Sequence, residues 1–289
     1  MKKLSDYITE YKDSFLNPAS GFKTGLTNLD GLISIQRGEF AIIGGRSSMG
    51  KTSLLLDMAL HISRSSIIGL FSMEMNIKEI LRRMVANLSG ISFNRIRRQF
   101  LTEAEILRIE TSLQELSRRT IYFDDRTGFT LQQIESELTQ LIKIQPIDVL
   151  FIDYLQLIRP TERYRNRVDE VTEASAGLKS IAKTYNVGLI VACQLNRAAD
   201  SREETFYRPR LSDLRESGSI ENDADMVLLL YRPYYYLRNR NASATDDGKA
   251  EIIVAKQRNG PTGVIHANFD AETMSFSRGE VNQLGEKMF

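Results

Sequence analysis

Short apolar runs alternate with helical patterns along most of the chain. The runs are FAIIGG, IIGLFSM, VLFID, VGLIVACQ and MVLLLY. Each is continuously apolar rather than alternating, which is typical of strands buried on both faces of a sheet. Strands of this kind separated by helices predict an α/β fold, with a mostly parallel central sheet covered by helices on both sides.

Helix starts are marked by a polar capping residue followed three positions later by Glu or Gln. This pattern predicts helices that satisfy their first backbone amides locally. The pairs are Asn76 with Glu79, Thr102 with Glu105, and Thr130 with Gln133. The predicted helices end near Gly90, Arg119 and Pro146, in that order. Two more are expected, from about Thr52 and over about 168–185.

The two ends of the chain follow other patterns. EIIVAK and VIHANF flank a Gly-Pro turn, which predicts a carboxyl-terminal antiparallel hairpin at the sheet edge. At the other end, residues 1–18 predict an amphipathic, linker-like helix that Asn17-Pro18 terminates. Leu4, Tyr7, Ile8 and Tyr11 share one face of it. This face is expected to be buried either against the chain's own core or against a neighbouring subunit.

Composition narrows the class of protein. The 289 residues suffice for one large α/β domain or two small ones. A net charge of +1 gives no global signal for a polyanion, so any nucleic-acid contact must come from local basic loops. Cys193, the single cysteine, excludes an intrachain disulfide and is expected to be a buried thiol.

Cellular location is constrained by what the sequence does not contain. The chain begins with MKKLSDYITEYKDSF, which has no apolar core of a signal peptide. No apolar run approaches the roughly 20 residues that span a bilayer. We therefore expect a cytoplasmic protein without a membrane partner, in a bacterial cytosol or, for a phage protein, in the cytosol of its host.

The segment GRSSMGKT, from Gly45 to Thr52, carries the strongest chemical signal. It matches the phosphate-binding loop G-x-x-x-x-G-K-T, and a predicted strand enters it while a predicted helix leaves it. Backbone amides of such a loop point at phosphate, and the helix amino terminus adds partial positive charge. Lys51 is expected to reach the β- and γ-phosphates, and the Thr52 hydroxyl to hold Mg²⁺.

Three more polar side chains follow apolar runs: Glu74, Asp153 and Gln194. Ligands of open α/β sheets bind at the carboxyl ends of strands. Asp153 is therefore expected to support Mg²⁺, Glu74 to orient or deprotonate an attacking water, and Gln194 to sense the γ-phosphate. The alternatives are a helix cap for Asp153 and a solvent-facing strand end for Glu74.

Basic residues gather in loops. The polar segment from Leu195 to Pro209 contains Arg197, Arg202 and Arg208, which suit the phosphates of a single strand. KQRNGPTG places Lys256 and Arg258 just before a turn. For each of these loops, a solvated charged surface is the alternative.

Several motifs together resemble the ATPase domain of DnaB-type replicative DNA helicases. They are TGLTNLDGLI, GRSSMGKTS, FSMEM, IDYLQLI, QLNR, DLRESGSIENDAD and KQRNGPTG. The match runs from about Gly21 to Phe276. The resemblance implies a RecA-like fold, a hexameric ring that binds ATP between subunits, single-stranded DNA in a central channel, and 5′ to 3′ translocation.

The resemblance also implies roles for particular residues. Glu74 is the catalytic carboxylate, Asp153 the metal-side acid and Gln194 the sensor. Lys256 and Arg258 reach across the interface to the neighbour's γ-phosphate. Nucleotide contacts are Gly45, Ser48, Gly50, Lys51, Thr52 and Ser53, and Arg83 approaches the phosphates. The DNA backbone is contacted by Arg215, Glu216 and Gly218, with Arg197 as a further DNA-binding candidate.

The expected organisation is a linker-like helix (1–18), a RecA-like ATPase domain (19–280) and a carboxyl-terminal tail (281–289). DnaB-type helicases also carry an amino-terminal primase-binding domain, which is not expected here, so primase and loader contacts are left open. Two other readings compete: a RecA/RadA-like recombinase, for which no Phe-x-x-Ala polymerisation segment is present, and a KaiC-like regulatory ATPase, against which the DLRESGSIE loop argues.

Overall fold

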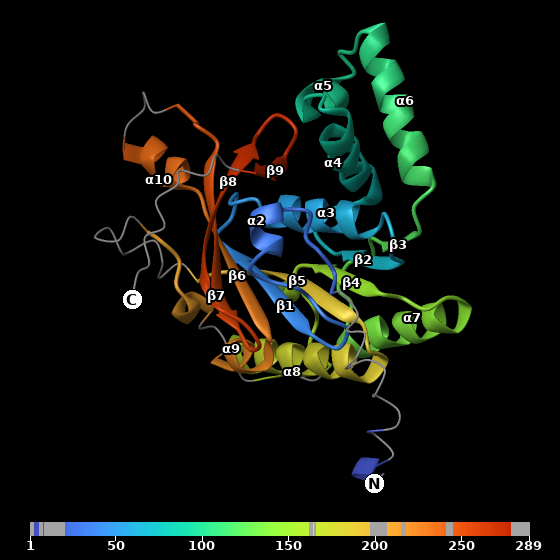
Figure 1. Ribbon diagram of the computed structural model, residues 1–289, viewed down its shortest axis with the longest axis vertical. Coiled ribbons are helices and arrows are strands. Elements are labelled where there is room, and N and C mark those ends of the chain that lie inside the picture. The colour runs from blue at the N-terminus through green and yellow to red at the C-terminus, as the bar shows by residue number, and fades with distance from the viewer. Residues whose placement is uncertain are drawn as a thin grey trace.

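A nine-stranded sheet forms the centre of the protein in a computed structural model (Figure 1). The structure describes residues 3–5, 8, 21–161, 164, 166–196, 207–214, 218–240 and 245–278. The strands are β1 (Phe40–Gly45), β2 (Ile68–Ser72), β3 (Ile121–Asp124), β4 (Val149–Asp153), β5 (Gly188–Gln194), β6 (Met226–Tyr231), β7 (Lys249–Gln257), β8 (Gly263–Asp270) and β9 (Ser275–Arg278).

The strand order is β3-β2-β4-β5-β1-β6-β7-β8-β9. The first six strands in this order pair in parallel, and β7, β8 and β9 add an antiparallel edge. The predicted mostly parallel sheet with a carboxyl-terminal hairpin is therefore confirmed. The parallel strands are continuously apolar because helices pack on both faces of the sheet. All residues of β1, β2, β4 and β6 are buried.

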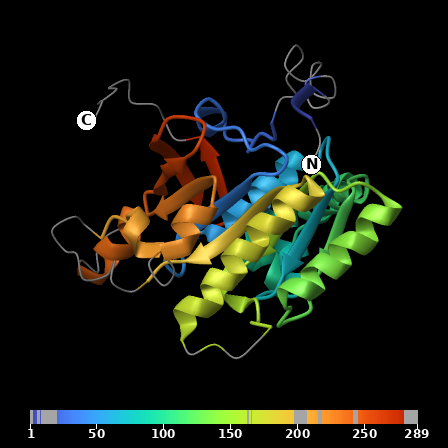
Figure 2. The same ribbon diagram turned by 90° about the horizontal axis from the view of Figure 1, so that it is seen from below.

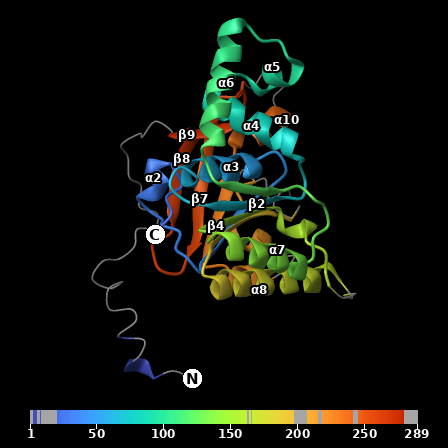
Figure 3. The same ribbon diagram turned by 90° about the vertical axis from the view of Figure 1, so that its right-hand side faces the viewer.

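Helices cover the two faces separately. On one side lie α2 (Thr27–Asp30), α3 (Lys51–Ile62), α4 (Ile77–Ser89), α5 (Phe93–Arg98) and α6 (Glu103–Ser117); on the other lie α7 (Leu131–Ile144) and α8 (Arg167–Tyr185), as Figures 1 and 3 show. Figure 2 shows α7 and α8 covering one face of the sheet. The shorter elements are η1 (Leu155–Leu157), η4 (Leu211–Leu214), α9 (Gly218–Asp223) and α10 (Pro233–Arg240).

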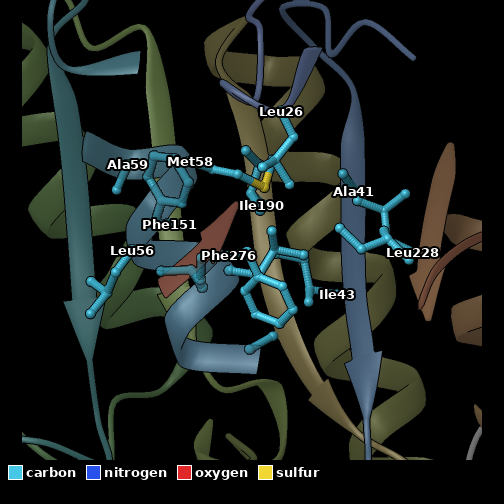
Figure 4. Packing of buried hydrophobic residues seen from close by; sticks show 14 of the residues in the cluster. Leu26, Ala41, Ile43, Leu56, Met58, Ala59, Phe151, Ile190, Leu228 and Phe276 are labelled. Atoms are coloured by element: carbon cyan, nitrogen blue, oxygen red, sulfur yellow. The ribbon is translucent and has the colours of Figure 1, made fainter. Parts of the chain in front are cut away.

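Each face of the sheet has its own apolar core. On the α3 side, Met58 and Leu56 of α3 pack with Phe151 of β4, Ile43 of β1 and Phe276 of β9 (Figure 4). On the α8 side a second cluster fills the space between the sheet and α7 and α8. Cys193 lies in this second cluster as a buried free thiol, as expected.

The predicted capping residues begin their helices. Thr102 and Thr130 form complete capping boxes with Glu105 and Gln133, and Asn76 accepts a hydrogen bond from the backbone of Glu79. Gly90 ends α4 with left-handed backbone at φ 64°. None of the described helices has both the length and the apolar composition needed to cross a bilayer.

Most of the predicted amino-terminal helix, including Tyr7 and Tyr11, lies outside the described residues, as does the tail 281–289. Leu4 and Ile8, on its predicted apolar face, are helical and exposed. Where that face docks stays a prediction.

Candidate active site

The loop between β1 and α3 turns the chain sharply at the carboxyl end of the sheet. Ser48 and Gly50 adopt left-handed backbone, with φ 65° and 96°. A Cβ on Gly50 would lie 3.0 Å from the ring of Phe276, so packing as well as backbone conformation favours glycine there. Consecutive right- and left-handed residues before a helix amino terminus form a concave set of amides that suits an anion.

Lys51, the first residue of α3, folds back over this loop. Its Nζ donates a hydrogen bond to the backbone oxygen of Arg46, with the two atoms 3.2 Å apart. Burial lowers the pKa of Lys51, and the negative charges of Asp153 and Glu74 oppose that shift. The ammonium group is thus placed inside the loop and within electrostatic range of both predicted carboxylates.

Thr52 and Asp153 come together as the sequence predicts. The Thr52 hydroxyl donates to Oδ2 of Asp153 at 2.7 Å. Asp153 is 1% exposed, and its Oδ1 has no hydrogen-bond partner among the described residues. Burial raises the pKa of Asp153, while the Thr52 hydrogen bond lowers it. An orphaned carboxylate oxygen beside a hydroxyl provides the oxygen donors that Mg²⁺ prefers, so these residues fit a magnesium ion.

The described residues contain no group of three or more His, Cys, Asp or Glu side chains that could hold a metal ion unaided. In phosphate sites, Mg²⁺ is commonly held by one or two protein ligands together with water and substrate phosphates.

Glu74 and Arg83 border the same site. Glu74 is exposed and lies two residues beyond the end of β2, whose Ser72 is in register with Asp153 of β4. The strand thus ends slightly earlier than the apolar run indicates. Arg83 projects from α4 with its guanidinium 5.4 Å from the centre of the Phe93 ring. Burial lowers the pKa of Arg83, and the charges of Glu79, Asp153 and Glu74 raise it.

Gln194 lies beside the loop at the end of β5. It is in register with Gly45, and its Nε2 donates to the Ser47 hydroxyl at 3.2 Å. Its backbone is held on both sides by Gln156, which accepts from the Gln194 amide at 3.1 Å and donates to its carbonyl at 2.9 Å. The predicted sensor position is therefore fixed relative to the loop.

Gln156 and Arg46 make contacts in the site that no sequence pattern predicts. Arg46 donates to the backbone oxygen of Leu195 at 2.9 Å and so ties the loop to the chain that leaves β5. Both residues lie within motifs that were noticed, IDYLQLI and GRSSMGKT. Their partners, however, are backbone groups at the end of β5 and just after it, far along the chain, and no local pattern reveals such contacts.

Lys256 and Arg258 lie at the opposite end of the sheet. The Arg258 amide donates to the backbone oxygen of Asp225, and the Asp225 amide donates to that of Phe40, the first residue of β1. Since β1 rises about 3.3 Å per residue from Phe40 to Gly45, Arg258 is roughly 16 Å from the loop of its own chain. The structure does not bring this pair to Lys51 of the same chain.

The predicted DNA contacts are only partly described. Arg197, Arg215 and Glu216 lie outside the described residues. Gly218 begins α9, which packs against η4 and α8 (Figure 1). Arg208, at the end of the polar segment, forms an ion pair with Glu251 of β7 at 2.7 Å.

The sheet order, the loop after β1 and the acid at the end of β4 define a RecA-like P-loop fold. Residues 21–278 match the family described as the DnaB-like helicase C terminal domain, and the chain belongs to that family.

Named relatives agree with this assignment. The chain is 35% identical over 286 residues to the replicative DNA helicase DnaB of Rickettsia bellii (89% of this chain, 57% of the relative). It is 36% identical over 261 residues to the replicative DNA helicase DnaC of Bacillus subtilis (89% and 56%). The chain thus spans somewhat over half the length of these curated relatives.

Solved structures show the same fold. One solved ATPase domain superposes with a TM-score of 0.87 and 30% identity, over 97% of this chain and 100% of that one. A DnaB-like replicative helicase, from a structure that also describes its interactions with primase, superposes with a TM-score of 0.85 and 32% identity, over 94% and 67%.

Proposed function

We propose that this chain is the ATP-hydrolysing motor domain of a replicative DNA helicase. In this proposal it assembles as a hexameric ring, moves 5′ to 3′ on single-stranded DNA and unwinds the duplex ahead of it. The observation that carries the proposal is the juxtaposition of the β1–α3 loop with Asp153 and Gln194 at one end of the sheet. Family membership and relatives named replicative DNA helicases support the choice of substrate.

The proposed chemistry follows from the placement of each group. The amides of the loop, from Gly45 through Ser48 and Gly50 to Ser53 in the first turn of α3, would surround the β- and γ-phosphates of ATP. Lys51 would exchange its hydrogen bond to Arg46 for one to phosphate. Arg83 would add a second cation. These fixed hydrogen-bond donors would stabilise the negative charge that spreads over the phosphoryl oxygens in the transition state.

Thr52 and Asp153 would hold Mg²⁺ in this site. When bound, the ion would neutralise part of the negative charge of the phosphates. Glu74 would accept a proton from the attacking water or orient it. Gln194 would hydrogen-bond the γ-phosphate and, through its connection to the segment after β5, report its presence.

Arg258 and Lys256 would complete the pocket of an adjacent copy. Arg258 borders a surface cavity of about 320 Å³ together with Glu39 and Asn259, and 47% of its side chain is exposed. Because it lies at the far end of the sheet from its own loop, a role in hydrolysis requires a second chain. Hydrolysis is thereby tied to assembly.

The proposed activity predicts that single-stranded DNA stimulates ATP hydrolysis by at least about ten-fold, because the ring must engage its track to cycle. Phosphate release is measured with and without single-stranded DNA, alongside unwinding of forked duplexes with a free 5′ or 3′ tail and the mass of the assembly. ATP hydrolysis that ignores DNA would instead favour a regulatory ATPase, and strand exchange without unwinding would favour a recombinase.

For Glu74→Gln, we expect kcat for ATP hydrolysis to fall on the order of 10²- to 10⁴-fold, because the amide cannot accept the proton of the attacking water. The affinity for ATP should stay within about three-fold, since Glu74 is not expected to bind phosphate. Affinity is measured with a fluorescent ATP analogue and turnover by phosphate release.

Glu115→Gln is the matched control for Glu74→Gln. Glu115 lies on the surface of α6 and pairs with Arg119, so the same chemical change there should leave turnover unaltered. If Glu74→Gln abolished binding of the ATP analogue, its role would be structural.

A further inference from the structure

One buried carboxylate at the amino end of the sheet joins four elements. Asp225 precedes β6, and its side chain is 8% exposed. Its Oδ2 accepts the amide of Phe40 in β1 at 2.8 Å and the Nζ of Lys179 in α8 at 2.5 Å. Its Oδ1 lies 3.2 Å from Nη1 of Arg258, just after β7. The two oxygens therefore serve different partners.

The guanidinium of Arg258 is gripped from a second direction by α9. Its Nη2 donates to the backbone oxygen of Asn222 at 2.7 Å. Lys256 donates beside it to the oxygens of Glu221 and Ala224. Both cations thus lie at the carboxyl end of α9, where unpaired carbonyls and the helix dipole favour positive charge.

These contacts hold Arg258 without covering it. A guanidinium has five N–H donors in a planar fork, so Nη1 and Nη2 can each direct one N–H at Asp225 and Asn222 and still have further N–H groups for a phosphate. With nearly half of its side chain exposed, Arg258 is both oriented and accessible. A long arginine side chain without such partners would sample many rotamers, and only a few would meet a phosphate on an adjacent copy.

We propose that Asp225 is a positioning residue for hydrolysis: it fixes the orientation in which Arg258 is presented to the pocket of the adjacent copy. The inference rests on the proposed function of Arg258 in trans. Asp225 also accepts a hydrogen bond from the first amide of β1, the strand that leads into the chain's own phosphate loop. It therefore connects Arg258, which acts on the adjacent copy, to the nucleotide pocket of its own chain.

The decisive variant is Asp225→Asn. The amide oxygen can still accept from Phe40, which places the amide NH₂ group opposite Arg258, donor against donor. In the full oligomer with single-stranded DNA, we expect kcat for ATP hydrolysis to fall about ten-fold or more, as for a misplaced catalytic group. Binding of a fluorescent ATP analogue should change less than about two-fold, because the nucleotide lies at the other end of the sheet.

Lys179→Met is the matched control, because it removes the other ion pair of the same carboxylate and leaves Oδ1 facing Arg258. It should lower the melting temperature about as much as Asp225→Asn does, yet keep kcat within about three-fold of the wild type. Equal losses of kcat in Asp225→Asn and Lys179→Met would mean that Asp225 has only a structural role. An unchanged kcat in Asp225→Asn would also contradict the positioning role.

Mixed oligomers give a readout that a structural role would not move. Asp225→Asn subunits have an intact pocket, and Lys51→Ala subunits have an intact Arg258 with its support. A mixture of these two variants should hydrolyse ATP severalfold faster than the mean of the two separate pools. A mixture of Asp225→Asn with Arg258→Ala subunits should show no such gain, because neither variant supplies a correctly placed arginine. Equal responses in both mixtures would overturn the inference.

Failure of the inference is distinguishable from failure of the proposed function. A wild-type chain without DNA-stimulated ATP hydrolysis would refute the function itself. A fully active wild type, an inactive Arg258→Ala and an active Asp225→Asn would refute only the positioning role.

Discussion

Lys51→Ala should lower ATP hydrolysis on the order of 10²- to 10³-fold, because the pocket loses its main fixed charge at the phosphates. The ammonium group is already placed inside the loop, 3.2 Å from the Arg46 oxygen, and within range of Asp153 and Glu74. Once Lys51 has exchanged its hydrogen bond to Arg46 for one to phosphate, its charge is effective because no further reorganisation is needed when the phosphoryl group moves. Phosphate release with saturating single-stranded DNA measures the effect.

Lys249→Ala is the control for Lys51→Ala. Lys249 is 74% exposed at the start of β7 and pairs with Asp247, so losing this surface ion pair should leave turnover unchanged. Normal turnover in Lys51→Ala would refute the assignment of the phosphate site. Equal turnover losses in both variants would point to a general effect of lost positive charge.

Much of the fold was predictable because local signals agree with the tertiary structure. The buried strands β1, β4 and β6 read as continuous apolar runs, and the helix starts at Thr102 and Thr130 carry their capping boxes in sequence. The elements that escaped prediction are short, and β3, β9, α5 and α10 are among them. β3 is only four residues long and half-buried at the sheet edge, so it lacks a long apolar run.

The candidate site divides in a similar way. The strand-end rule correctly placed Asp153 and Gln194 beside the loop, because parallel strands present their carboxyl ends together. The supporting contacts of Gln156 and Asp225 could not be foreseen. Their partners lie 38 and up to 185 residues away along the chain, so only the folded structure brings them together.

The two ends of the sheet carry complementary halves of one proposed catalytic unit. The loop with Lys51 and Asp153 occupies the carboxyl end, and Arg258 with its support from Asp225 occupies the amino end, roughly 16 Å away. A chain with this arrangement cannot complete its own pocket. Repeating the same contact head to tail gives a ring when the rotation between copies closes, and in the proposed ring every copy both gives and receives a cation.

Arg258→Ala should therefore lower ATP hydrolysis on the order of 10³-fold or more, as expected for a lost arginine finger. The affinity for ATP at the chain's own loop should be retained. The fold should persist because Asp225 keeps its ion pair with Lys179 at 2.5 Å. Turnover, binding of a fluorescent ATP analogue and the mass of the assembly are measured on the same preparation.

Mixing Arg258→Ala with Lys51→Ala subunits separates a trans role from a cis role. In an equal mixture with independent interfaces, about one quarter would join an intact pocket to an intact arginine, so activity should reappear at up to that fraction of wild type. Arg95→Ala is the matched control, because Arg95 has a similar exposure of 48% and pairs with Glu105 of α6. Arg95→Ala subunits alone should keep wild-type turnover. If demonstrably mixed oligomers stayed inactive at every ratio, Arg258 would not complete the pocket of an adjacent copy and would lose its proposed role.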